Sequence, residues 1–125
     1  MINTKDSQTA MAFARVFATL SDLNRLLILK ALGEKEKSVN QLAIELNLSQ
    51  PLVSHHLAAL KAVGLVKTKK AGSFVFYSVA TKKIADLINS LENTLEDIAK
   101  NMELAPFPQS LFPFIGRGRR GRRWM

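Results

Sequence analysis

The chain has 125 residues, 47% of them hydrophobic, which is enough apolar material for one domain with a buried core and excludes a wholly disordered protein. Its 18 Lys and Arg side chains outnumber 10 Asp and Glu, and the formal net charge of +8 favours a polyanionic partner, nucleic acid before an anionic membrane surface. Cysteine is absent, which excludes disulfides, thiolate metal sites and cysteine redox switches.

The start of the chain lacks the apolar run of a signal peptide, and no apolar stretch reaches the roughly 18 residues that a membrane span needs. We therefore expect a cytoplasmic protein without a membrane partner. The positive charge is uneven, because five of the seven arginines lie in the last nine residues. The basic character is thus partly a property of the C-terminal tail.

Two helices are predicted before the first glycine of the chain. Residues 5–20 place apolar side chains, among them Phe13 and Phe17, at helical spacing. Ser21 or Asp22 can cap a second helix, since both side chains accept hydrogen bonds from the free N–H groups of a first turn.

The next segment predicts a helix-turn-helix. Ser38 is expected to cap a third helix, and Asn47 suits a left-handed position in the turn that follows it. Ser49 is expected to cap a fourth helix that ends at Gly64, with Pro51 in the first turn, where its missing N–H costs little. Two short helices around a tight turn are typical of a DNA-reading unit.

A β-hairpin is predicted directly after the fourth helix. Residues 65–69 and 74–79 are rich in β-branched and aromatic side chains, and residues 70–73 between them form a basic, glycine-containing tip. A hairpin in this place is a wing, and its lysines are Lys67, Lys69 and Lys70.

A fifth helix is predicted over residues 81–102, and its apolar stripe is long for a domain of this size. We expect the first and fifth helices to form a dimer surface through Phe13, Phe17, Ile84, Leu87, Ile88, Leu91, Leu95 and Ile98. The alternative, that both stripes pack inside one monomer, stays open. The expected fold is thus mainly α with a small hairpin, a winged helix-turn-helix.

The composition changes after this helix, and we divide the chain into a domain of residues 1–104 and a segment of residues 105–125. Prolines and phenylalanines alternate first, followed by glycines and five arginines. These arginines could follow DNA phosphates, enter a minor groove or stack on unpaired bases, or they could only keep the chain soluble. They are Arg117, Arg119, Arg120, Arg122 and Arg123.

Residues 20–79 resemble the ArsR/SmtB family of bacterial and archaeal repressors. The segments that carry the resemblance are Leu20-Ser21-Asp22 with Arg25, Ser49-Gln50-Pro51-Leu52-Val53-Ser54-His55-His56-Leu57, Gly64-Leu65-Val66, Gly72 and Tyr77. The resemblance implies a homodimer with its first and last helices at the interface, a dyad-symmetric operator, and repression that a ligand relieves.

The familiar metal sites of that family are missing from this chain. The third helix contains no cysteine, and Asp86 is followed two residues later by Ile88 where an Asp-x-His pair would stand. The last helix contains no histidine. We expect no metal and no cofactor, which leaves an organic ligand, a partner protein or no effector at all.

The fourth helix and the wing are expected to carry the DNA contacts. Gln50 can form two hydrogen bonds to adenine, and we expect it and Ser54 to carry specificity. His56 either contacts DNA or braces the helix from behind. The full set of expected DNA-binding residues is Ser49, Gln50, Pro51, Ser54, His55, His56, Lys61, Lys69, Lys70 and Ser73.

We expect no enzymatic activity, because there is no cysteine, the only two histidines are neighbours on the expected DNA face, and no glycine-rich phosphate loop follows a strand. The leading hypothesis is a sequence-specific transcriptional regulator, in particular a repressor. One alternative is an architectural or general nucleic-acid binder whose affinity comes mostly from the tail. Another is a protein-interaction module that uses the Pro/Phe segment.

Overall fold

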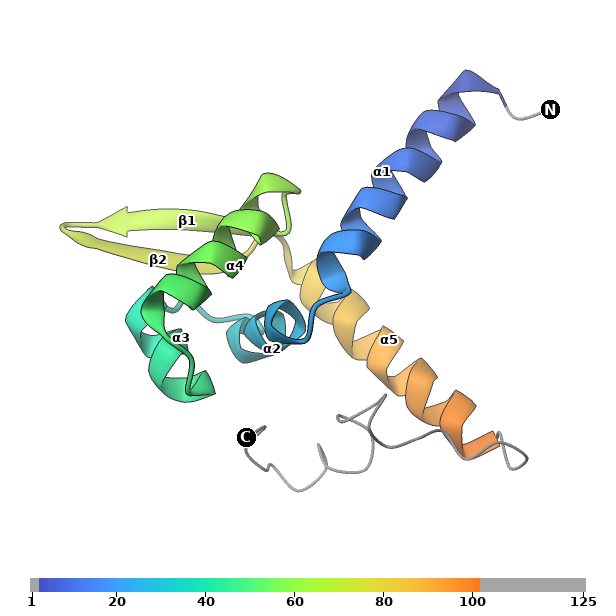
Figure 1. Ribbon diagram of the computed structural model, residues 1–125. Helices are drawn as coiled ribbons and strands as arrows, with labels where there is room; N and C mark the ends of the chain where they lie inside the picture. The colour runs from blue at the N-terminus through green and yellow to red at the C-terminus, as the bar shows by residue number, and fades with distance from the viewer. Residues whose placement is uncertain (1–2, 102–125) are drawn as a thin grey trace.

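The computed structural model describes residues 3–101 and confirms the winged helix-turn-helix (Figure 1). None of the helices in this range combines the length and hydrophobicity that crossing a bilayer requires. The elements in chain order are α1 (Thr4–Leu20), α2 (Leu23–Leu32), α3 (Val39–Leu46), α4 (Gln50–Ala62), β1 (Val66–Ala71), β2 (Phe74–Val79) and α5 (Lys82–Asn101).

Side-chain caps fix where the first four helices begin. Asp22 accepts a hydrogen bond from the N–H of Arg25, which decides between the two predicted caps of α2. Ser38 and Ser49 cap α3 and α4 as expected, and Gln41 completes a capping box with Ser38. Each cap satisfies N–H groups that the helix itself cannot bond.

The turn between α3 and α4 is built around Asn47, which has a φ of 56° and thus the left-handed conformation predicted for it. The N–H of Leu48 then donates to the carbonyl of Ala43 at 3.0 Å. This tight return brings α4 across α3 and completes the helix-turn-helix.

The hairpin is longer at its tip than predicted. The sequence pattern ended the first strand at Lys69, but Lys70 pairs with Val75 and Ala71 pairs with Phe74. Only Gly72 and Ser73 remain in the turn. Gly72 has a φ of 63°, and glycine in the left-handed region permits a two-residue turn that follows the natural twist of the strands. The wing is therefore a stiffer arm than a four-residue loop would make.

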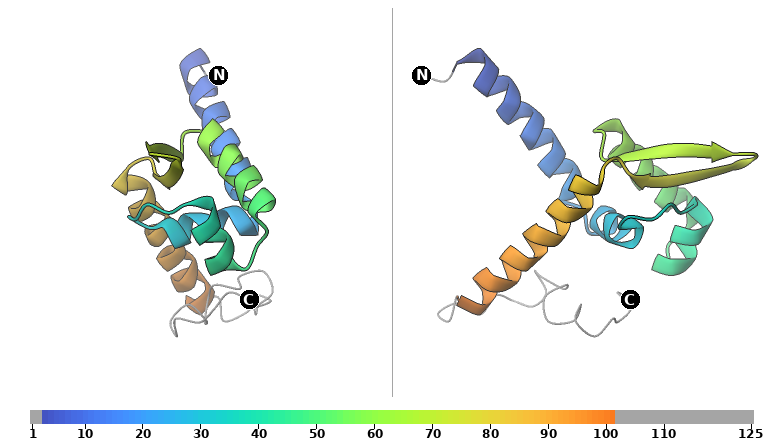
Figure 2. Two further views of the ribbon diagram at one scale, coloured as in Figure 1. Left: turned by 90° about the vertical axis from the view of Figure 1, so that its left-hand side faces the viewer. Right: turned by 180° about the vertical axis from the view of Figure 1, so that it is seen from behind.

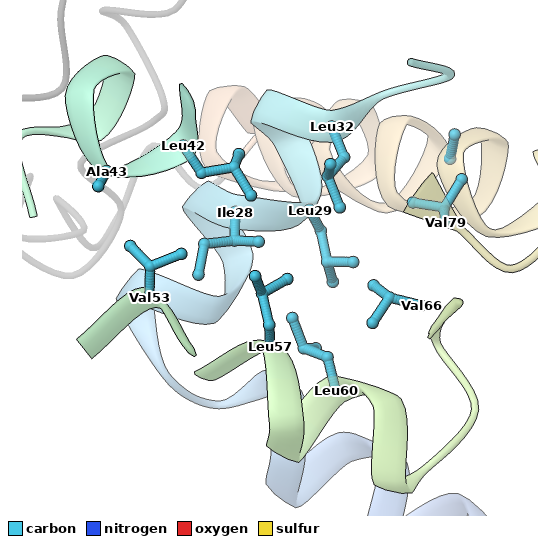
Figure 3. Close-up of a cluster of buried hydrophobic side chains, with 11 residues drawn as sticks. Ile28, Leu29, Leu32, Leu42, Ala43, Val53, Leu57, Leu60, Val66 and Val79 are labelled. Atoms are coloured by element: carbon cyan, nitrogen blue, oxygen red, sulfur yellow. The ribbon is translucent and has the colours of Figure 1, made fainter. Parts of the chain in front are cut away.

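One apolar cluster holds α2, α3, α4, the base of the hairpin and the start of α5 together (Figure 3). Ile28 and Leu32 of α2, Leu42 of α3, and Leu57 and Leu60 of α4 are completely buried. Val66 and Val79 pair at the base of the hairpin and join this core. The helix-turn-helix and the wing thus share one packed interior.

The helices α1 and α5 extend away from the hairpin and diverge from each other (Figures 1 and 2). None of the 17 residues of α1 is buried. An isolated helix of this length is marginally stable in water, because most helical stability in proteins comes from packing an apolar face. The arrangement leaves α1 in need of a further surface to cover it.

Candidate nucleic-acid interface

The helix α4 has a buried apolar side and an exposed polar side near its N-terminus. Val53, Leu57 and Leu60 face the core. The predicted DNA contacts on the opposite side are all exposed, namely Ser49, Gln50, Pro51, Ser54, His55 and, at the other end, Lys61. The first turn also directs backbone N–H groups outward, where they can bind phosphate.

Gln50 does not stand alone on this surface. Its Nε2 donates to Oδ1 of Asn40 on α3 at 2.8 Å. Asn40 is exposed and was not among the predicted residues, because only the folded turn brings it next to Gln50. The bond uses one of the two amide N–H groups of Gln50 and leaves the other, with Oε1, free for a base edge.

The prediction that His56 contacts DNA is wrong, because its side chain is buried. His56 is only 5% exposed, and its Nδ1 accepts a hydrogen bond from Nε of Arg25 at 3.1 Å. Nε2 lies 3.9 Å from Oδ1 of Asp22. The histidine therefore braces α4 against the start of α2, which is the alternative that the sequence left open.

Burial and neighbouring charges together favour the neutral form of this histidine. Burial is the main cause that lowers the pKa of His56 below its ordinary value of 6.5. Asp22 acts in the opposite direction, whereas Arg25 and the adjacent His55 lower the pKa further. Because Nδ1 must accept from Arg25, the neutral form with its proton on Nε2 is the one that fits.

The wing presents an uninterrupted positive charge. Lys67, Lys69 and Lys70 are exposed, as is Ser73 in the turn, and no acidic residue occurs between Val66 and Val79. Lys61 of α4 donates to Oγ1 of Thr68 at 3.4 Å. This contact joins the end of α4 to β1, so that helix and wing present adjoining cationic surfaces.

The predicted dimer residues divide into two groups. Phe13, Phe17, Leu87, Leu91 and Ile98 are exposed, and Leu95 is half-buried. Ile84 and Ile88 are half-buried and pack against the protomer's own core, and their contact with a partner stays a prediction. Met11, which was not predicted, is 68% exposed on α1.

Two further expectations concern metals and the tail. Among residues 3–101, no three His, Asp or Glu side chains gather as they would around a metal ion. The five arginines of the basic tail and the Pro/Phe segment lie outside the described residues.

Comparisons with known proteins agree with this geometry. The family described as "Bacterial regulatory protein, arsR family" matches residues 22–68. The HTH-type transcriptional regulator KmtR of Mycobacterium tuberculosis is 35% identical over 83 residues, which cover 66% of this chain and 63% of that protein's own length. The uncharacterized HTH-type transcriptional regulator MJ1325 of Methanocaldococcus jannaschii is 36% identical over 63% of this chain and 90% of its own.

Solved structures show the same fold. The homodimeric winged helix-turn-helix DNA-binding domain Mb0332 of Mycobacterium bovis aligns with a TM-score of 0.73 and 25% identity, over 83% of this chain and 97% of that one. Reduced HlyU of Vibrio cholerae aligns with a TM-score of 0.65 and 30% identity, over 74% of this chain and 97% of that one.

Proposed function

The chain belongs to the ArsR family of bacterial regulatory proteins, and we propose that it is a homodimeric repressor that binds a dyad-symmetric DNA operator. The observation that carries the proposal is the position of α4. Its polar N-terminal half is exposed over a fully buried apolar side, beside a hairpin with three lysines and no acid. A helix exposed in this way fits the major groove, while the wing reaches the adjacent backbone.

Specificity in this proposal comes from Gln50 and Ser54, and from His55 beside them. Gln50 retains Oε1 and one N–H for adenine, and Asn40 holds its amide in a fixed orientation. Ser54 and His55 are exposed one turn further along the helix and can donate to bases or phosphates. Lys69 and Lys70 bind phosphates and add affinity for any sequence.

Dimerisation in this proposal covers α1. Phe13 and Phe17 are 61% and 62% exposed, and Leu87 on α5 is 63% exposed. Burying one such side chain contributes about 1.5–3 kcal/mol, so a symmetric partner gains each contribution twice. The pair then places two copies of α4 about one duplex turn apart, roughly 34 Å, on one face of the DNA.

The proposal is tested by selecting bound duplexes from a random DNA pool with the full chain. We expect an inverted repeat. Ser54→Ala should then reduce the free-energy difference between operator and random-DNA binding by about 0.5–1.5 kcal/mol, the contribution of one hydrogen bond, whereas Ser90→Ala on α5 should leave that difference unchanged. Selection without dyad symmetry, or equal ratios for both variants, would contradict the assignment.

Sedimentation tests the dimer separately. Phe17→Ser should raise the dissociation constant of the dimer about tenfold or more. Ile44→Ser is a matched control, because Ile44 is 74% exposed on α3, away from α1 and α5. If the control dissociates the dimer and Phe17→Ser does not, the interface lies elsewhere.

A further inference from the structure

Two phenylalanines lie on a face of the wing that the core does not use. Phe74 is 64% exposed, and its ring centroid lies 6.4 Å from that of the half-buried Phe76, with 33° between the ring planes. Side chains directly opposite each other in an antiparallel pair point to the same face. The pairs Lys69–Phe76 and Ala71–Phe74 therefore share one face, which we call the outer face of the wing.

The other face of the hairpin is the one that folds onto the domain. It carries Val66 and Val79, which join the core, and Thr68, which accepts the hydrogen bond from Lys61. Figure 2 shows the hairpin projecting well beyond the helices. Phe74 follows the two-residue turn directly. It thus lies at the far end of the wing, on the outer face.

The surroundings of Phe74 indicate which partner would cover it. Lys69 shares the outer face with Phe74, and Lys70 lies beside the tip on the opposite face. No acid lies on the hairpin, and the ion pairs within residues 3–101 involve none of its lysines. An apolar ring with lysines around it fits a polyanion that can expose an apolar surface between two rows of phosphates. Duplex DNA does so where two stacked base pairs separate in the minor groove.

We propose that Phe74 is a wedge that enters the minor groove and partly unstacks one base step, which kinks the DNA. Phe76 supports the ring from behind, and the lysines at the tip hold the phosphates on both sides of the opened step. Flexible pyrimidine–purine steps, TA and CA, are the easiest to open and would be preferred. This inference rests on the proposed function only in requiring that the chain binds duplex DNA.

The test uses ring closure of a linear mixed-sequence duplex of about 100 bp by DNA ligase, which is inefficient without a bending protein because the persistence length is about 150 bp. The full chain at saturation should raise the yield of circles. Phe74→Ser should lower that yield about tenfold at equal DNA occupancy, and Phe74→Leu should retain much of it, because leucine also serves as a wedge. Val75→Ala is the matched control, since Val75 is 36% exposed on the opposite face of the same strand.

The outcomes separate this inference from the proposed function. If gel shifts show binding and Phe74→Ser closes circles as well as the unchanged chain does, the wedge is refuted while DNA binding stands. The wedge is also refuted if Val75→Ala lowers the yield of circles as much as Phe74→Ser does. If the full chain shifts no duplex at all, both proposals fail.

Discussion

Lowering the pH from about 7.5 to about 5 should destabilise the fold through His56. In the folded chain Nδ1 of His56 accepts from Nε of Arg25 at 3.1 Å, and the side chain is 5% exposed. A proton on Nδ1 removes that acceptor and places a positive charge beside the guanidinium. Leaving a buried group without its partner costs about 1–3 kcal/mol, which sets the size of the expected loss in the free energy of unfolding.

The direction follows from the pKa. Burial, the first cause, lowers the pKa of His56 in the folded state, whereas the unfolded chain titrates near the ordinary value of 6.5. The unfolded state therefore binds more protons as the pH falls below 6.5. The contribution of neutral His56 is fully present above that pH and is lost progressively below it.

Urea unfolding at several pH values measures this effect, and the chain supplies its own control. It has only two histidines, and His55 is exposed while His56 is buried. His56→Gln should remove most of the decline in stability between about pH 7 and about pH 5, and His55→Gln should keep it. If His55→Gln flattens the profile instead, or if neither variant does, the reasoning about the Arg25 contact is refuted.

Three further predictions follow from individual contacts. Leu57→Ala should lower the free energy of unfolding by about 2–5 kcal/mol in the same urea assay, since Leu57 is fully buried, and a loss well under 1 kcal/mol would mean that the core is loosely packed there. Asn47→Ala should lower the free energy of unfolding by about 1 kcal/mol, because the φ of 56° is unfavourable for alanine, whereas Asn47→Gly should lower it little. Equal losses for the two variants in thermal melts would contradict this explanation. Lys70→Ala should reduce the slope of log affinity against log salt by about one for operator and random DNA alike, and an unchanged slope would remove Lys70 from the interface.

The ends of the elements could be predicted because the signals are local. A capping side chain acts within three residues, so Asp22, Ser38 and Ser49 carry their information in the sequence itself. The same is true of Asn47, whose conformation depends on its own backbone. The extra paired residues at the wing tip were missed because Lys70 and Ala71 have no strong preference for strand or loop.

The sequence predicts less where contacts with another helix decide which way a side chain faces. The sequence leaves His56 either on the DNA face or behind the helix, and the structure selects the second position. The buried positions of α4 are 53, 56, 57 and 60, which form one helical stripe at spacings of three and one. The stripe was visible in the sequence, but a polar residue within it was not assigned to the core. The bond between Gln50 and Asn40 has no such signal, because it joins two helices through a turn.

The contact with one DNA half-site and the spacing of the two half-sites depend on different parts of the structure. Val53 and Leu57 of α4 share a core with Val66 and Val79 of the wing, so the position of the wing relative to the recognition helix is set within one protomer. The distance between the two copies of α4 in the proposed dimer is set instead by α1 and by the part of α5 after Ile88, which extend away from that core. Changes at the exposed faces of α1 and α5 should therefore alter which operator spacing is accepted and leave the base preference of each half-site intact.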